Sequence, residues 1–538
     1  MMTESLMVVG PLLIVAFGGL AMMLVDAFAK QKTELSLVSA VILLGAASMS
    51  LGLWFGGPGY VEHGTIGRYL AYDGIAHFLD LVICGSAAVA ALLAGGYLRE
   101  HRIERGEFYV ILLFSAFGAM GLARATDLIT VFISLETLSL GIYGLVAYRR
   151  ASPRSAEAAI KYFLLGSFAS AILLFGMALL YGATGHTHIH DIALFIQQGD
   201  AVPALVFMGM LLVTAGLAFK VSAVPFHAWA PDAYQGAVTP ATTYMAVVVK
   251  AAVFGVMIRL LVDGLGHESV ANLGTGWPPA LMGLSVITLV VGNVAALVQK
   301  DVKRMLAYSS ISHAGFLLLG MVATWKLGGG FGMRSVLFYL GGYAVSNLLA
   351  FGSLIAAGSF GKEATSYEDL AGLGRRHPWI GIPFTLGILS LMGFPPTAGF
   401  FAKYYVILAA VQGGGPLVWV AVIAVLSSAV GAYYYLRVLV FLFMKSPEKD
   451  APVAVPMKNG YVIAALVMCG YFVVRMGITP GSYLSLAADH PHHDVDLDWT
   501  VFLIDAGVAV IGGAIAAAVA TMKRKGDPTG EAEAEAAG

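Results

Sequence analysis

Four charged residues stand deep inside apolar stretches of the sequence. Glu136 lies near the middle of "DLITVFISLETLSLGIYGLVAYRR", and Lys220, Lys250 and Lys403 lie in three later apolar runs. A charge inside a lipid bilayer is unfavourable by several kcal/mol unless a partner or a function compensates for it. Lys250 has about ten apolar neighbours on either side, so snorkelling to the membrane surface explains it poorly. We therefore expect these four residues to carry ion chemistry.

The chemistry that these residue types support is reversible binding of a proton. An ammonium group taken out of water releases its proton more readily, and a carboxylate about 4 Å away opposes that release by about 4 kcal/mol at an effective dielectric constant of about 20. Moving a proton against about 100 mV requires about 2.3 kcal/mol. A carboxylate at Glu136 that pairs with Lys220 and then separates from it would act as a switch. The alternative is an ion pair that only holds two helices together.

Proline stands close to two of the lysines. Pro225 follows Lys220 by five residues, and Pro395 and Pro396 precede Lys403. Proline removes a backbone donor and opens a helix, and paired broken helices in the two halves of a transporter mark its ion path. The two breaks lie about 170 residues and five predicted spans apart. We expect two five-helix repeats of opposite orientation; the alternative is that these prolines merely kink packed helices.

Other polar residues in apolar runs have simpler interpretations. His227 is a candidate proton relay, because histidine titrates near neutral pH, or else an ordinary hydrogen-bonded histidine. Asp80 suits a local polar contact, while Arg259 and Lys161 suit snorkelling to the membrane surface. The histidine-rich segments "GHTHIHD" at 185–191 and "DHPHHDVD" at 489–496 are interpreted as flexible surface histidines rather than metal sites.

Composition places the chain among polytopic membrane proteins. Of its 538 residues 59% are apolar and 12% are charged, with a mean hydropathy of +0.82, whereas an ordinary soluble domain is about 25% charged. The net charge of −1 gives no case for nucleic acid. Two cysteines cannot ligate an iron–sulfur cluster, and neither G-x-G-x-x-G nor a P-loop lysine motif occurs. The energy must therefore come from an ion gradient or a partner chain.

Hydropathy predicts an all-α protein with fourteen or fifteen transmembrane helices. The first span is interpreted as retained rather than cleaved. With the N-terminus outside, twenty Lys and Arg residues fall in cytoplasmic connections and five on the opposite side, which favours that orientation and an odd number of spans. The predicted spans are 5–28, 35–55, 74–97, 108–124, 126–148, 158–182, 203–229, 237–262, 277–299, 305–323, 333–357, 379–411, 416–444, 460–477 and 501–521.

Five segments carry a resemblance to a known family. Together they closely resemble subunit N of the proton-pumping NADH:quinone oxidoreductase, respiratory complex I, over roughly residues 70 to 445. Subunits L and M and the multi-subunit sodium/proton antiporters share a looser version. The segments are "LETLSLGIYGLVAYRR", "SPRSAEAAIKYFLLGSFASAILLFGMALLYGATG", "FKVSAVPFHAWAPDAYQGAVTPATTYMAVVVKAA", "KDVKRMLAYSSISHAGF" and "GFPPTAGFFAKYYV".

The resemblance implies roles for individual residues. Glu136 matches the glutamate of the family's fifth helix, Lys220 the lysine of its broken seventh helix and Lys250 the central lysine of its eighth. Lys403 matches the lysine of the broken twelfth helix, where subunit M carries glutamate. The candidate relay residues, some from this resemblance and some from the residues alone, are His227, Lys161, Tyr308, Ser309, His313 and Arg437.

The sequence departs from the family in two places. It has "QGAVTP" where the family usually has "EGAPTP", which puts a carboxylate role at Gln235 in doubt. It also has a fifteenth predicted span and the acidic tail "GEAEAEAAG", which is interpreted as disordered, whereas the family normally has fourteen spans.

The resemblance implies a multi-pass subunit of the bacterial inner membrane that supplies one proton channel. Protons would load Lys220 from the cytoplasm, pass to Lys250 and leave through Lys403. No cofactor or metal is expected in this chain; FMN, iron–sulfur clusters and quinone belong to partner subunits of the complex. The alternatives are a subunit of a sodium/proton antiporter, a membrane hydrogenase subunit, and a structural subunit whose charges only pair. The expected units are 1–107, a first repeat at 108–262, a second at 277–444, and 445–538.

Overall fold

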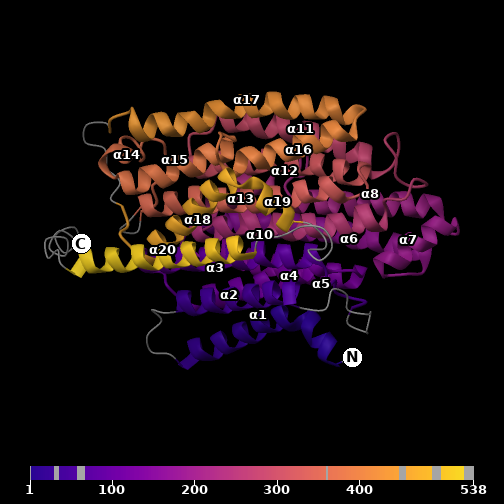
Figure 1. Cartoon of the computed structure of the whole chain (residues 1–538), viewed down its shortest axis with the longest axis horizontal. Coiled ribbons are helices and arrows are strands. Elements are labelled where there is room, and N and C mark those ends of the chain that lie inside the picture. The colour runs from indigo at the N-terminus through magenta and orange to yellow at the C-terminus, as the bar shows by residue number, and fades with distance from the viewer. Residues whose placement is uncertain are drawn as a thin grey trace.

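The computed structural model describes residues 2–28, 35–56, 67–358, 362–447, 456–487 and 499–525. Within these ranges the chain forms helices and no named strand. The long helices run roughly along the horizontal axis of Figure 1, which is therefore the direction in which they would cross a membrane. The second histidine-rich segment and the acidic tail fall outside the described residues.

The helices follow one another with short connections. Their bounds in chain order are α1 (Met2–Phe28), α2 (Leu35–Gly56), α3 (Gly74–Glu100), α4 (Gly106–Arg124), α5 (Leu128–Val146), α6 (Pro153–Thr184), α7 (Ile189–Gln198), α8 (Pro203–Lys220), α9 (Trp229–Gly236), α10 (Thr239–Met257), the π-helix η1 (Ile258–Gly264), α11 (Trp277–Leu297), α12 (Val302–Lys326), α13 (Gly330–Ala357), α14 (Leu373–Arg376), α15 (Pro378–Met392), α16 (Ala398–Gly413), α17 (Pro416–Phe443), α18 (Gly460–Ile478), α19 (Pro480–Leu486) and α20 (Trp499–Lys525).

Thirteen helices in the described part of the chain are long and apolar enough to cross a membrane. The other two predicted spans correspond to the shorter pair α15 and α16 and to α20, of which residues 504–518 are described as an apolar helix. The helix α1 begins at one end of the bundle and α20 ends at the other (Figure 1), which agrees with an odd number of crossings. The all-α polytopic class is confirmed.

Local sequence signals explain where several helices begin. The side chains of Asp73, Asp127 and Asp301 each accept a hydrogen bond from the first turn of α3, α5 and α12. Ser152 caps α6, and Pro153 occupies its first turn, where a missing backbone donor has no consequence. These caps fix the starts of helices that carry the site.

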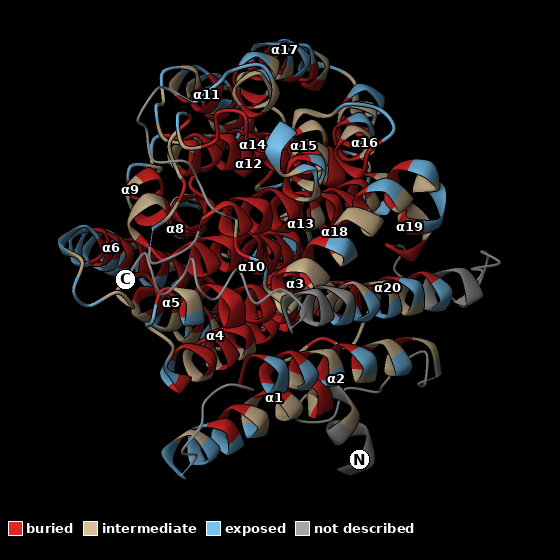
Figure 2. Ribbon diagram, turned by 90° about the vertical axis from the view of Figure 1, so that its left-hand side faces the viewer, coloured by how far each residue is buried: buried red, intermediate tan, exposed pale blue. Residues whose placement is uncertain are grey.

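Four helices form the centre of the molecule. Nearly every residue of α3, α10, α12 and α13 is buried, whereas α1, α6 and α17 lie at the edge and present exposed apolar side chains (Figure 2). Such side chains on a membrane protein face lipid or a neighbouring subunit. The charges on the central helices are therefore enclosed by protein.

Two predicted spans are interrupted. The predicted span 203–229 is divided into α8, which ends at Lys220, and α9, which begins only at Trp229. Ser222, at φ +61°, and Pro225 lie in this break. The predicted span 379–411 is likewise divided into α15 and α16, since Gly393, at φ +90°, ends α15 before the two prolines. Both breaks fall where the prolines indicated them.

The last helix is fastened to the bundle by a polar cluster. Asp505 of α20 forms an ion pair with Arg475 of α18 at 2.8 Å and accepts hydrogen bonds from Tyr471 and Tyr483. The opposite face of α20 carries exposed isoleucines and valines. The additional span thus packs on α18, and the buried Asp505 anchors it there through these polar contacts.

Candidate functional site

Lys220 and Glu136 do not pair directly. Lys220, which is 3% exposed, donates to Ser139 Oγ at 2.8 Å and to Tyr143 Oη at 3.4 Å. Glu136 accepts from Ser170 Oγ at 2.5 Å. Among the described residues no nitrogen–oxygen contact within 4.0 Å joins the lysine to the glutamate, so this structure shows the two groups separated. Ser139, one turn after Glu136 on α5, stands in its place.

Glu136 occupies the edge of an outward face of α5. It is half-buried, and the residues that share its face, Ile129, Ile133 and Leu140, are each more than half exposed. The carboxylate of Glu136 therefore contacts α6 and also lies close to the outer surface of the chain.

Lys250 lies at the centre of the molecule on α10. It is 3% exposed and donates to Ser310 Oγ and to Tyr343 Oη, the latter at 3.4 Å. Tyr343 donates to Ser310 at 2.8 Å, and Tyr234 of α9 shares a hydrogen bond of 3.2 Å with Ser310. The hydroxyl of Ser310 thus joins the central lysine to the broken seventh helix.

Lys403 lies beside the second break. Its ammonium group donates to Met392 O at 2.8 Å, the last residue of α15, and to Ser428 Oγ of α17 at 2.9 Å. It also lies 5.3 Å from the centre of the Phe316 ring. The break leaves a carbonyl oxygen without a helical partner, and the lysine supplies the donor.

A line of hydroxyl groups and one imidazole lies between Lys250 and α16. His313 contacts Tyr339 Oη through Nδ1 at 2.6 Å and Tyr435 Oη through Nε2 at 3.3 Å, and Ser309 is hydrogen-bonded to Tyr435. His313, Tyr339 and Tyr343 line one side of a narrow pocket, and Gly399 and Ala402 of α16 line the other. The pocket is too tight for a water molecule as it stands.

The remaining predicted residues lie apart from this line. His227 is half-buried in the first break, and its Nδ1 has no hydrogen-bond partner within the described structure. Tyr308 is half-buried on α12. Lys161 is 47% exposed and pairs with Glu157 at 2.7 Å and with Asp232 of α9 at 2.9 Å. It thus makes ion pairs with α6 and α9 as well as reaching the surface.

Arg437 lies near the end of α17. It donates to Gln299 O at 3.3 Å and stacks over the Tyr367 ring at 4.3 Å. Gln235, at the position of the altered motif, accepts from Arg304 at 3.3 Å. The side-chain amide of Gln235 thus contacts the guanidinium group of Arg304, although this position carries no carboxylate.

Sequence reasoning missed the groups that contact the lysines. Ser139 and Tyr143 follow Glu136 at one-turn and two-turn spacing on α5, a signal that could have indicated them. Ser310 lies in the noted segment "AYSSISH". No sequence pattern indicated Tyr343 or Tyr435, because they contact Lys250 and His313 from helices that are distant in the sequence.

The arrangement can hold and move protons. Each hydroxyl both donates and accepts a hydrogen bond, and each lysine can lose its proton, so a proton can pass along such groups once they are connected. None of Lys220, Lys250 and Lys403 forms an ion pair with a carboxylate in the described structure. No group of three metal-ligating side chains occurs among the described residues.

Comparison with known proteins identifies the family of the chain. Residues 125–431 match the family described as "NADH:quinone oxidoreductase/Mrp antiporter, TM". NADH-quinone oxidoreductase subunit N 1 of Sorangium cellulosum is 50% identical over 495 residues, which cover 89% of this chain and 97% of that protein. The chain belongs to the subunit N family.

Solved structures place this subunit N among related membrane proteins. A chain of respiratory complex I from Thermus thermophilus is 34% identical, with a TM-score of 0.74 over 89% of this chain and 100% of that chain. A chain of the Mrp complex from Dietzia sp. superposes with a TM-score of 0.76 at 22% identity, over 90% of this chain and 96% of that chain, and so shares the fold. The expected resemblance to subunit N is confirmed.

Proposed function

We propose that this chain is the proton-translocating subunit N of a bacterial NADH:quinone oxidoreductase. Its homologues are named as subunits of that enzyme, and a chain of a solved respiratory complex I covers 89% of its length. Oxidation of NADH and reduction of quinone then take place in partner subunits that hold FMN and iron–sulfur clusters. This chain carries protons across the inner membrane.

The observation that carries the proposal is the way in which the three lysines are held. Lys220, Lys250 and Lys403 are each buried, and their contacts are hydroxyls or a carbonyl rather than carboxylates. A lysine whose only role was to hold helices together would be expected to face a carboxylate. A buried lysine without a facing carboxylate can release its proton more easily, and this favours a relay over the structural alternative.

The route runs from Lys220 to Lys250 and on to Lys403. Four polar groups support the second step, since Ser310, Tyr343, His313 and Tyr435 lie between the last two lysines. The narrow pocket there must widen to admit water or bring these groups into line.

Glu136 acts as the switch through its electric field at Lys220 rather than by direct contact. Its place beside an exposed face of α5 lets a charge on a neighbouring membrane subunit change its field. Disturbing Glu136 then changes how firmly Lys220 holds its proton, and each charge acts on the next.

The two five-helix units remain part of this proposal. The first would comprise α4 to α10 and the second α11 to α17, each with its fourth helix broken beside a lysine-bearing segment. The proposed orientation places the N-terminus outside. The arginine-bearing α14 lies near the end of the bundle where α20 ends, and α7 lies at the opposite end (Figure 1), as the charge distribution requires.

Replacing the central lysine tests the proposal. In the purified complex reconstituted into vesicles, Lys250→Ala should lower the number of protons moved per NADH oxidised while the complex still assembles. Lys326→Ala, which changes an exposed lysine on α12, serves as the control. If Lys250→Ala moves as many protons per NADH as the parent, the central relay is wrong. Loss of assembly in Lys220, Lys250 and Lys403 variants alike would favour the structural alternative.

A further inference from the structure

Two buried arginines outside the relay contact α3 or its cap, one from the helix of Lys250 and the other from the end of α4. Arg259 follows Lys250 on the continuous helix formed by α10 and η1. Arg124 ends α4, directly before the turn into α5 and Glu136. Arg124 is 0% exposed and Arg259 is 5% exposed. Neither residue snorkels to the membrane surface, which corrects the interpretation given to Arg259 from the sequence.

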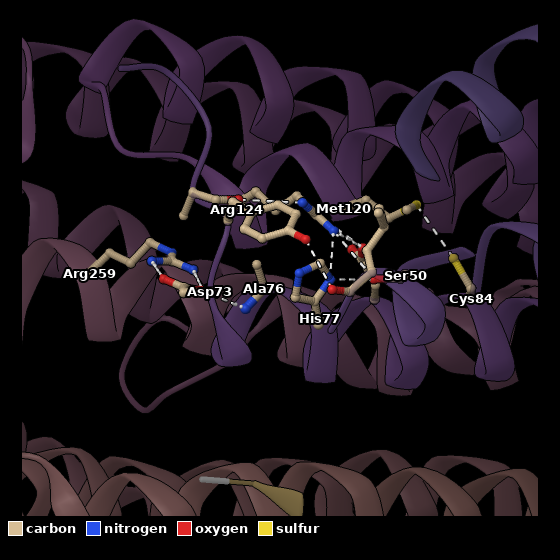
Figure 3. Close-up of polar contacts among 12 residues, drawn as sticks. Ser50, Asp73, Ala76, His77, Cys84, Met120, Arg124 and Arg259 are labelled. Atoms are coloured by element: carbon tan, nitrogen blue, oxygen red, sulfur yellow. Dashed lines mark hydrogen bonds and ion pairs between the residues drawn. The ribbon is translucent and has the colours of Figure 1, made fainter. Parts of the chain in front are cut away.

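Arg259 uses its whole guanidinium group. Its Nη1 and Nη2 donate to the two carboxylate oxygens of Asp73 at 2.7 and 2.8 Å, and its Nε donates to Ala123 O of α4 at 2.9 Å (Figure 3). Asp73 in turn accepts from Ala76 N at 2.8 Å as the cap of α3. One side chain thus ties η1 to the first turn of α3 and to the last turn of α4.

Arg124 binds α3 two turns further on. It forms an ion pair with Asp80, which is also 0% exposed, and its Nε donates to Asp80 Oδ2 at 3.1 Å. Ser50 of α2 donates to the same oxygen at 2.8 Å and lies 2.9 Å from His77 Nδ1 (Figure 3). Asp80 is therefore part of a buried network across three helices rather than a local contact.

The helices are in direct contact between these two pairs. A Cβ atom on Gly255 of α10 would come within 2.5 Å of Leu79 of α3 and within 3.3 Å of Ala123 Cα of α4. The contact lies between Lys250 and Arg259 on the same helix, so α10 packs closely against α3 and α4 at this level.

We propose that Asp73, Asp80, Arg124 and Arg259 form an α3 clamp, a set of positioning residues that holds the end of α4, directly before the helix of Glu136, in one register with the helix of Lys250. The proposal rests on the proposed relay. The interaction between charges depends on their separation, so a shift between these helices changes how strongly Glu136 acts on the lysines. A guanidinium group bound through two nitrogens fixes orientation as well as distance, which a single ammonium group cannot do.

Conservative variants test the clamp in the assembled complex. Arg259→Lys keeps the charge but loses the two-nitrogen contact, and Asp73→Asn keeps the shape but loses the charge. Both should oxidise NADH while the protons moved per NADH fall to the value that Lys250→Ala gives. Amide hydrogen exchange at residues 123–128 should become faster in both variants, because the end of α4 loses its tether.

A matched pair elsewhere provides the control. Asp505→Asn removes an Arg–Asp pair that joins α20 to α18, and it should leave the proton number unchanged. The double variant Asp80→Leu/Arg124→Met removes the fully buried pair without leaving a lone charge, so it should still assemble, with a lowered proton number.

The outcomes separate the two proposals. If Lys250→Ala lowers the proton number and assembled clamp variants do not, the clamp is wrong and the relay stands. If Lys250→Ala has no effect either, the relay itself fails. If no clamp variant assembles whereas Asp505→Asn does, the four residues serve folding alone, and this too overturns the clamp.

Discussion

At the scale of single residues, the site depends on hydroxyl groups more than on paired charges. Ser139 accepts a hydrogen bond from the ammonium group of Lys220. Ser310 accepts one from the ammonium group of Lys250 and another from Tyr343. A hydroxyl stabilises an ammonium group less strongly than a carboxylate does, and it can pass a proton on by rotating. This residue choice favours transfer over permanent pairing.

Removing the Ser310 hydroxyl should slow the relay. Ser310→Ala leaves Lys250 with Tyr343 as its remaining hydrogen-bond partner. A hydrogen bond to a charged group is worth about 1.5–3 kcal/mol, so transfer through Lys250 should become roughly 10- to 100-fold slower. The rate of proton uptake by vesicles during NADH oxidation measures this. Ser335→Ala, which removes a hydroxyl bonded only to its own helix at Phe331 O, is the control; equal rates in the two variants would contradict the role of Ser310.

At the scale of elements, close packing of α4 on α5 holds Glu136 in place. A Cβ atom on Gly118 of α4 would come within 2.4 Å of Leu138 N, two residues after Glu136. Ser115 also donates to Leu138 O at 3.1 Å. The backbone of α5 therefore has little freedom at this level, and only glycine fits opposite it.

Gly118→Ala should separate the two helices. The strain of an added methyl group against backbone is about 1–3 kcal/mol, so the complex should lose activity at a lower temperature than the parent. Gly85→Ala on α3, where no atom lies within 4 Å of the added Cβ, should be neutral or stabilise by about 0.5–1 kcal/mol. Thermal inactivation of the purified complex compares the two. A Gly118→Ala complex as stable as the Gly85→Ala complex would show that α4 can move away freely.

The cap of α3 should stay ionised at every working pH. Burial opposes ionisation of Asp73, but Arg259 outweighs it and holds the pKa of Asp73 at about 2, below its ordinary 3.8. A carboxylate with a lowered pKa contributes stability that is complete above its ordinary pKa and is lost as the pH falls through about 2. The difference in thermal inactivation between the parent and Asp73→Asn should therefore be the same at about pH 6 and about pH 8.5. A difference that shrinks at the lower pH would mean that Asp73 titrates nearer to neutrality.

At the scale of the whole molecule, the proposed relay runs from α5 and α8 through the central α10 to α16, and the additional α20 lies outside this path. The helix α20 packs on α18, and its contacts with Arg475, Tyr471 and Tyr483 involve no relay residue. Its outer face is apolar and exposed, as suits lipid or a neighbouring subunit.

Removing residues 499–538 should leave proton pumping intact. The truncated chain keeps every relay residue and the α3 clamp, so the number of protons moved per NADH should equal that of the parent. Thermal stability should fall, because Arg475 loses its ion-pair partner. Pumping in vesicles and thermal inactivation test the two expectations. A lowered proton number with full assembly would assign α20 a part in transport.

The sequence by itself determined the class, the family and the positions of the four core charges. Composition and apolar runs indicated a polytopic helical protein, because a bilayer allows few other solutions. Prolines located both helix breaks to within a few residues, since a missing backbone donor acts locally. Long motifs identified subunit N before any fold was known.

Only the tertiary structure decided which groups meet. Whether Glu136 touches Lys220, and which hydroxyl receives Lys250, depends on packing between helices far apart in the chain, and no local pattern encodes that distance. Arg259 suited snorkelling to the membrane surface, yet it is buried against Asp73, the cap of α3, and Arg124 is buried against Asp80 of α3. A charge's position in the sequence fixes its depth in the membrane, whereas its partner is fixed by the fold.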